Sequence, residues 1–238
     1  MKRAARSPGQ PTVLVTAFEP FGGRSINRSQ LVLEHIVRAA GLPKGVRGGA
    51  KGARVVARTL PVSFSRLGPA LARALACKPD VVLLLGESRE AEQLRLERVA
   101  VNRIHARIAD NDGMQPIDRA IVEEGPAAYF STVRPKSALV AVRRSGTAAS
   151  LSNDAGTFAC NAAYYLALHR LHRRQGEAPP AIFIHIPTKG RSLALRDATR
   201  GVLSLLRHLV DQTSRSASGA RRAATGNLRA SPAGGRKS

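Results

Sequence analysis

The stretch "VVLLLG" (residues 81–86) is the most apolar run in this 238-residue chain, and it has the length and composition of a buried strand. Two other uncharged runs resemble it, "TVLVTAF" (12–18) and "AIFIHIP" (181–187). Helical patterns lie between such runs, for example "RSQLVLEHIVRAAG" (28–41) and "SRLGPALARALACKPD" (65–80). Strands that alternate with helices form βαβ units, in which helices cover both faces of a mainly parallel sheet. The sequence therefore predicts a single-domain α/β fold, an α/β/α sandwich.

The remaining segments extend this pattern without an internal repeat or linker. Further strands are predicted at 54–62, 98–104 and 148–152, and further helices at 135–146, 157–176 and 192–213. Surface loop is predicted at 44–52 and irregular structure at 106–132. We therefore expect one domain over residues 12–212, preceded by a flexible basic segment, 1–11.

Positive charge dominates the composition, with a formal net charge of +22. Residues 213–238 are rich in Ser, Ala, Gly and Arg and contain no acidic residue, so we expect a disordered basic tail. Such a charge attracts nucleic acid and other polyanions without selecting a sequence. A basic solvated surface together with this tail is the favoured explanation of the composition.

Cellular location follows from what the chain lacks. Its two cysteines are far apart and make no disulfide framework. The first apolar run is too short for a secretory signal, and no run approaches the roughly 18 residues of a membrane span. We therefore expect a soluble cytoplasmic protein.

Cys160 lies in "DAGTFACNAAYY" (154–165), where a loop gives way to a helical pattern near Phe158. Unpaired N–H groups and the dipole at a helix start favour a thiolate. Cys77, at the end of an Ala/Leu helix, is instead predicted to be a packed small hydrophobe.

A nucleophilic thiol needs a base, commonly histidine. His185 interrupts the buried strand 181–187 near its carboxyl end, where it is either a satisfied core residue or a catalytic base. Glu97, just before an apolar strand, is a candidate to orient such a base, although acids at strand edges are usually solvated. The other histidines fall in amphipathic helices or beside a strand: His35, His105, His169, His172 and His208.

Other site motifs are missing. The sequence has no phosphate-binding loop, no dinucleotide fingerprint, no G-x-S-x-G elbow and no zinc-ligand spacing. The residues alone therefore permit a cysteine hydrolase but do not require one.

A set of motifs in fixed order resembles the pyroglutamyl peptidase I (pyrrolidone carboxyl peptidase) family of cysteine peptidases. The matching pieces are "VTAFEPFGG", "LPVSF", "LERVAVN", "ARIADNDGMQP", "GPAAYFST", "DAGTFACN" and "FIHIP". The resemblance implies removal of an amino-terminal pyroglutamyl residue from peptides through a thiol acyl-enzyme. It also implies no cofactor, no metal, and a homo-oligomer, either a dimer or a tetramer.

The family's functional residues fall on definite positions of this chain. The resemblance makes Cys160 the nucleophile, His185 the base and Glu97 its orienting acid, and places Arg107 beside the nucleophile. It implies that Phe18, Phe21 and Asn27 bind the flat lactam ring, which needs apolar faces and a few hydrogen bonds. Glu87 occupies a position where a pocket glutamine is common, so it is expected to contact substrate too.

Several positions depart from the family's usual pattern. "GESREAE" (86–92) replaces a glycine-rich stretch, so Glu87 could accept the lactam N–H, repel the substrate or raise the pKa of His185. "CNAAYY", "PTKGR" and "SNDAG" also differ from common family sequences. Two alternatives stay open: a divergent homologue that acts on another N-acyl group, and an inactive basic protein that binds polyanions.

Overall fold

The computed structural model describes residues 10–39, 48–50, 53–188 and 193–227, of which residues 48–50 and 216–227 are described by their backbone alone. A central sheet has the strand order β2-β3-β1-β4-β9-β5-β8, and β6 and β7 form a separate pair. The strands are β1 (Thr12–Phe18), β2 (Gly48–Ala50), β3 (Ala53–Leu60), β4 (Val81–Ser88), β5 (Leu94–Glu97), β6 (Val99–Val101), β7 (Ala128–Phe130), β8 (Ala149–Ser152) and β9 (Ala181–Pro187). The helices are α1 (Arg28–Ala39), α2 (Phe64–Leu75), α3 (Pro135–Arg144), α4 (Ala159–His172) and α5 (Leu195–Asn227).

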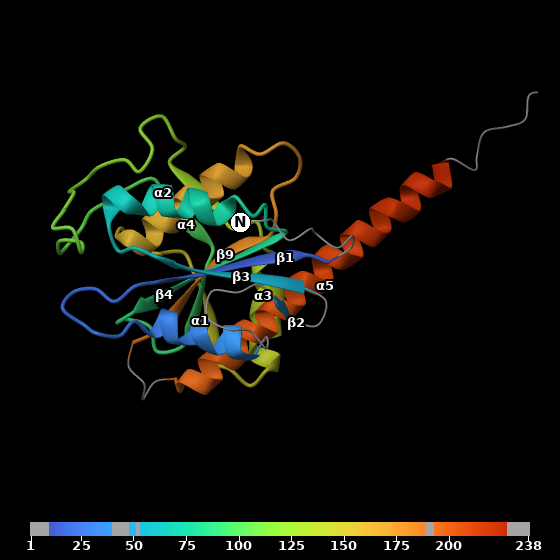
Figure 1. Cartoon of the computed structure of the whole chain (residues 1–238), viewed down its shortest axis with the longest axis horizontal. Coiled ribbons are helices and arrows are strands. Elements are labelled where there is room, and N and C mark those ends of the chain that lie inside the picture. Colours follow the sequence, from blue (N-terminus) through green and yellow to red (C-terminus); the bar gives the residue numbers. More distant parts are fainter. Residues whose placement is uncertain (1–9, 40–47, 51–52, 189–192, 228–238) are drawn as a thin grey trace, which may run out of the picture.

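The sheet is mainly parallel, as the sequence predicted. Strands β3, β1, β4 and β9 run parallel, and so do β5 and β8. The pairs β2–β3 and β5–β9 are antiparallel. Helices α1, α3 and α5 cover one face, and α2 and α4 cover the other (Figure 1). The predicted single α/β domain is confirmed.

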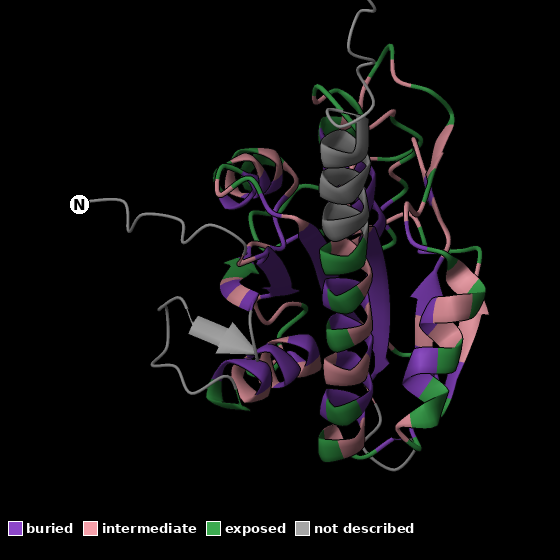
Figure 2. Ribbon diagram, turned by 90° about the vertical axis from the view of Figure 1, so that its right-hand side faces the viewer, coloured by how far each residue is buried: buried purple, intermediate pink, exposed green. Residues whose placement is uncertain are grey.

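Strand alternation decides which side chains meet which helices. Successive side chains of a strand point to opposite faces of the sheet. In β9, Ile182, Ile184 and Ile186 belong to the core under α1 and α5, so Phe183 and His185 point towards α4. The sheet is buried on both faces, whereas the outer side of α5 is exposed (Figure 2). Because of this alternation, one face of each central strand packs under α4.

Short strands were the elements that the sequence pattern missed. Strand β5 was not predicted, β6 is shorter than the predicted strand at 98–104, and β7 lies in the segment expected to be irregular. Strand β2 lies within the predicted loop 44–52, whose residues 44–47 and 51–52 are outside the described residues. Strands of three or four residues contain too few alternations to stand out, although the equally short β8 lies within the predicted strand 148–152. The partners of β5 and β7 are also distant in sequence, whereas β2 pairs with the adjacent β3.

The C-terminal segment also differs from expectation. Disorder was predicted from residue 213, yet α5 continues to Asn227. No proline interrupts residues 213–227, and their Ala and Arg residues favour helix whereas Ser, Thr, Gly and Asn do not, so the helix that begins on the core continues here by propagation. Residues 1–9 and 228–238, assigned to the basic ends, lie outside the described residues. No helix in the described ranges is long and apolar enough to cross a membrane.

Two helical glycines give a matched test of this packing. A Cβ at Gly201 in α5 would lie 2.8 Å from Thr147 Cγ2 and 2.9 Å from Leu94 Cδ1, whereas one at Gly68 in α2 would lie 4.0 Å from Leu166 Cδ1. We predict that Gly68→Ala changes stability by less than about 0.5 kcal/mol, because the gain in helix propensity is offset by crowding of the alanine Cβ against Pro69, the next residue. Gly201→Ala should destabilise it by about 1–3 kcal/mol through overpacking. Urea unfolding of both variants measures the difference, and a loss at Gly201 no larger than that at Gly68 would contradict the packing of α5.

Candidate active site

Cys160 is the second residue of α4, so it lies in the first helical turn as predicted. Phe158 is the N-cap and provides no side-chain cap hydrogen bond. The preceding loop is fixed by His105, whose N–H donates to Thr157 O (3.0 Å) and whose carbonyl accepts from Thr157 Oγ1 (3.0 Å). Gly156, with φ of +76°, supplies the left-handed turn that starts this approach. The local structure therefore presents the thiol at a rigid helix start.

Strand β4 passes very close to this thiol. A Cβ at Gly86 would lie 2.7 Å from Cys160 Sγ and 2.6 Å from Phe183 Cζ, closer than packed atoms approach. Glycine is thus needed at the point where α4 begins over the sheet. In the register of the sheet, Gly86 is paired with His185 of β9. This pairing brings His185 beneath Cys160.

The imidazole of His185 is bound from its other side by a carboxylate. Nδ1 of His185 lies 2.8 Å from Glu97 Oε1, and both residues are buried. Because β5 is antiparallel to β9, Glu97 comes from a strand that adjoins the histidine directly. Tyr164 of α4 donates its hydroxyl to Glu97 O (3.0 Å), which fixes the end of β5 against the same helix. A carboxylate hydrogen-bonded to Nδ1 leaves Nε2 as the reactive nitrogen.

The protonation of His185 is set by opposing effects. Burial lowers the pKa of His185, but hydrogen bonding to Cys160 and then to Glu97, together with their charges, raises it to about 9. The imidazole is therefore held protonated at neutral pH. The structure thus brings together Cys160, His185 and Glu97, three residues that are separated in sequence.

Asn161 anchors the helix start next to the thiol and was not singled out from sequence. Its Oδ1 accepts from Val101 N (2.9 Å), and its Nδ2 donates to Val101 O (2.9 Å) and Arg103 O (3.1 Å). The residue is fully buried, so these bonds satisfy its amide. An asparagine in a helical apolar pattern directly after a candidate nucleophile is the signal that could have identified it.

Aromatic side chains line the approach to the helix start. The ring of Phe21 lies 5.9 Å from that of Phe158, and Phe64 meets Phe158 edge to face at 5.3 Å. Phe18 is almost fully buried and packs behind them, 6.5 Å from Phe183. Phe21 and Phe18 were predicted from sequence, whereas Phe64 and Phe158 were not singled out, although both lie in the quoted motifs, because the sequence does not show that their rings meet.

Asn27 is placed in the same loop as Phe21 but is engaged with the backbone. Its Oδ1 accepts from Ser29 N (3.0 Å) and Ser29 Oγ (2.7 Å), and its Nδ2 donates to Glu19 O (3.0 Å). Its carbonyl also accepts from Gln30 N (3.0 Å), so it caps α1. In this structure Asn27 shapes the loop that contains Phe21.

Glu87 is not brought to Cys160. It follows Gly86 in β4, so its side chain points to the opposite face of the sheet, towards α1. Its carboxylate forms an ion pair with Arg24 and accepts the N–H of Arg28 (3.0 Å). The negative charge of Glu87, which the sequence placed near the substrate and His185, is therefore neutralised by Arg24 on the opposite face of the sheet.

Arg107 is exposed on the segment that follows His105, close in sequence to the contact with Thr157. Among the contacts of the described residues, none joins its guanidinium to Cys160. Among the other histidines, His105 contacts Asp118 (3.2 Å) and His169 contacts the Tyr129 hydroxyl (2.9 Å). Neither is turned towards the thiol by these contacts.

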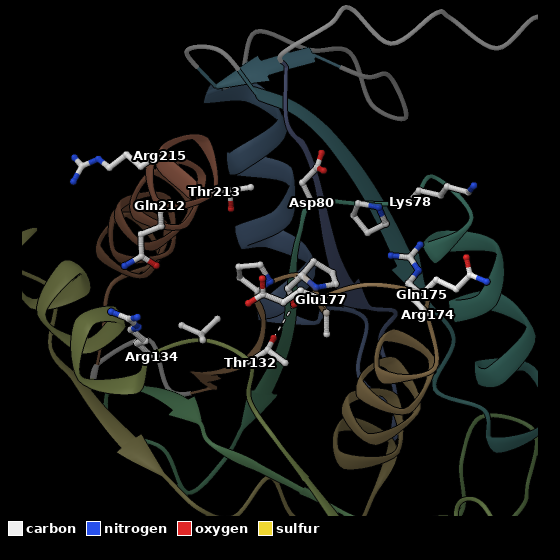
Figure 3. A pocket seen from close by; sticks show the side chains of 15 residues that line it. Lys78, Asp80, Thr132, Arg134, Arg174, Gln175, Glu177, Gln212, Thr213 and Arg215 are labelled. Carbon is white, nitrogen blue, oxygen red and sulfur yellow. Dashed lines mark hydrogen bonds between the residues drawn. The ribbon is translucent and has the colours of Figure 1, made fainter. Parts of the chain in front are cut away.

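A cavity of about 940 Å³ opens at the amino ends of the strands, on the edge opposite the catalytic residues. Arg134 and Arg215 lie on one side of it and Lys78 and Arg174 on the other, with Glu177 between them (Figure 3). None of the catalytic candidates lines this cavity, so it is separate from the reaction site. Over the described ranges, no group of three or more His, Cys, Asp or Glu side chains could hold a metal ion.

Comparisons with known proteins agree with this geometry. A sequence model of the family described as pyroglutamyl peptidase matches residues 11–217. The chain belongs to the pyroglutamyl peptidase family. This family consists of cysteine peptidases that remove N-terminal pyroglutamate. The predicted family is thereby confirmed.

Individual relatives support the assignment along most of the chain. The pyrrolidone-carboxylate peptidase of Clavibacter michiganensis is 45% identical over 179 residues, which cover 74% of this chain and 78% of that protein. The corresponding peptidase of Pectobacterium carotovorum is 46% identical over 178 residues, with the same coverage of the two chains. The solved pyrrolidone carboxyl peptidase from Thermococcus litoralis superposes with a TM-score of 0.77 at 32% identity, over 87% of this chain and 96% of that one.

Replacing Gly86 tests the contact between β4 and the thiol. In Gly86→Ala the new methyl group must displace both Cys160 Sγ and the Phe183 ring, which moves the thiol away from His185 and so lowers its thiolate character. We predict that alkylation of Cys160 by iodoacetamide slows by about tenfold or more. The measurement uses a Cys77→Ser background, with Gly68→Ala as the matched control. Unchanged alkylation would contradict the close approach of Gly86.

The raised pKa of His185 predicts a pH dependence of stability. Because the folded-state pKa is about 9 and the usual value 6.5, this stabilisation is complete below about pH 6.5 and is lost as pH rises through about 9. Glu97→Gln removes one cause of the raised pKa and should flatten this part of the curve. Urea unfolding between pH 6 and pH 10 tests it, and identical slopes would refute the coupling.

Proposed function

We propose that this chain hydrolyses the bond that follows an N-terminal pyroglutamyl residue, through an acyl-enzyme on Cys160. The observation that carries the proposal is the assembly of Cys160, His185 and Glu97 at a helix start beside an aromatic surface. The lactam ring is flat and neutral, so it suits the faces of Phe21 and Phe158 better than a charged amino terminus does. The family to which the chain belongs supports the same reaction.

The first half of the reaction forms the acyl-enzyme. Cys160 Sγ attacks the carbonyl carbon of the pyroglutamyl residue, with the thiol proton held on His185. The first intrahelical hydrogen bond of α4 runs from Ala162 N to Phe158 O (3.0 Å), so earlier N–H groups of the helix have no intrahelical acceptor. These groups supply an oxyanion site next to the nucleophile. In this proposal Arg107 assists from the adjoining segment, as the family resemblance implies.

The second half releases both products. Protonated His185 gives its proton to the leaving amine, and Glu97 keeps the imidazole oriented while the charge on it changes. Water, deprotonated by the now neutral His185, then attacks the thioester and frees pyroglutamate. Each step uses side chains of this chain, and the mechanism as proposed includes no metal or cofactor.

The test is release of 7-amino-4-methylcoumarin from its pyroglutamyl amide, with reductant present. We predict turnover by the unaltered protein and its loss in Cys160→Ser. Cys77→Ser should keep full activity, because Cys77 Sγ donates to Ala74 O (3.2 Å) just after α2 and lies away from the site. Glu97→Gln should lower kcat by about a hundredfold or more, since the carboxylate that supports imidazolium is lost.

Absence of turnover from folded protein would contradict the proposal. Activity on another N-acyl amide, tested in parallel with acetyl and prolyl analogues, would favour the divergent-homologue alternative instead. Loss of coumarin release in Cys160→Ser would show that the activity belongs to this chain and not to a contaminating peptidase.

The proposal extends to partners and location. The exposed apolar side chains Ile108, Met114, Ile117 and Phe130 all belong to residues 106–130, and we propose that a second copy covers them in a dimer or tetramer. The net charge of +22 and the cations around the far cavity support non-specific attraction to polyanions. A free thiol nucleophile fits a reducing cytoplasm.

A further inference from the structure

An ion pair between Arg24 and Glu87 joins the loop after β1 to the end of β4. The Glu87 side chain is only 3% exposed, whereas that of Arg24 is 32% exposed. We propose that this pair is a positioning device that holds Phe21 in the acyl-binding pocket and so sets the affinity for the lactam ring. The inference rests on the proposed function, because it concerns how that pocket is kept in shape.

The carboxylate of Glu87 binds two partners at once. One oxygen pairs with Arg24 Nη1, and the other accepts the backbone N–H of Arg28 at 3.0 Å, at the first residue of α1. A negative charge at a helix N-terminus is favourable. Arg28 in turn donates Nη2 to Leu193 O (2.7 Å), in the segment that precedes α5. Glu87 therefore links β4, the β1–α1 loop, α1 and the start of α5.

The link reaches the pocket through a tight turn. The N–H of Arg24 donates to Phe21 O (3.3 Å), and the two residues between them, Gly22 and Gly23, have φ of +62° and +73°. Arg24 is thus the last residue of the turn that Phe21 begins. The ring of Phe21 contacts Phe158, the N-cap of α4, two residues before Cys160. Movement of Arg24 must therefore be transmitted to the pocket wall.

The other end of the turn is held independently. Asn111 Nδ2 donates to Pro20 O (2.9 Å) and to Glu19 Oε1 (2.9 Å). Breaking the Arg24–Glu87 pair leaves this end in place and frees the other, so Phe21 gains freedom that substrate binding must remove. Cys160, His185 and Glu97 belong to the opposite face and keep their geometry. The pair should consequently affect substrate affinity and leave the chemical step intact.

The experiment compares Glu87→Gln, Arg24→Gln and the double variant on the pyroglutamyl coumarin amide. We expect KM to rise about tenfold in each single variant, the loss of roughly one charged hydrogen bond, with kcat within about twofold. The double variant should show no further rise, because the two residues act as one unit. Glu90→Gln and Arg89→Gln remove the charges of two exposed residues directly after β4. They are the charge-matched controls and should leave KM unchanged.

Three kinetic results would overturn the inference in an active enzyme: a fall in kcat with constant KM, additive effects in the double variant, or equal effects in the controls. Each would leave the proposed function intact.

Thermal unfolding gives a readout that needs no turnover. Arg24→Gln strands a buried carboxylate and should lower the melting temperature by several degrees, more than Glu87→Gln does, and the double variant should recover part of the loss. Independent melting shifts would refute the pair even if the protein were inactive. If the melting shifts were coupled but the protein showed no turnover, the pair would be real and the proposed function would be wrong. Its role in substrate affinity would then be wrong as well.

Discussion

The close approach of β4 to the start of α4 is the constraint on which the rest of the site depends. Gly86 has no side chain, so Cys160 Sγ and the Phe183 ring can come down onto the strand. Any larger residue there would lift the helix away from the sheet. Since Gly86 is paired with His185, the contact that admits the thiol also sets it above its base. Backbone packing thus fixes a distance that side-chain flexibility alone would leave loose.

Burial gives this arrangement its electrostatic character. His185 and Glu97 lie between the sheet and α4, where water is excluded and a charge must be compensated locally. Hydrogen bonds to Cys160 and Glu97 outweigh the effect of burial, so the proton is retained on the imidazole. The same strands supply much of the apolar core, and the reactive residues therefore belong to the most rigid part of the molecule. Pre-organised charge in a rigid, dry site is the main source of transition-state stabilisation in many enzymes.

The sequence revealed the long elements and the chemically conspicuous residues, but not the contacts between them. Strands such as β1, β4 and β9 are continuous apolar runs. Cys160 lies where a loop gives way to a helical pattern, and His185 interrupts an otherwise apolar strand. Glu97 could be identified only as a candidate, because β5 is four residues long and its antiparallel pairing with β9 is a tertiary property. Phe64 and Phe158 were not singled out because the contact between their rings is also a tertiary property. Glu87 was placed near the substrate from its position in the motif, whereas strand alternation turns it to the other face.

This last difference shows how one strand serves two purposes. Gly86 and Glu87 are consecutive, so one faces α4 and the thiol while the other faces α1 and Arg24. Chemistry and loop positioning are thereby placed on opposite sides of the sheet but share the rigid end of β4. A charge buried beside the imidazole would perturb the proton that catalysis requires, and the sheet separates Glu87 from it. The loop that contains Phe21 crosses from one side to the other, so the ion pair can act on the pocket without adding a charge to it.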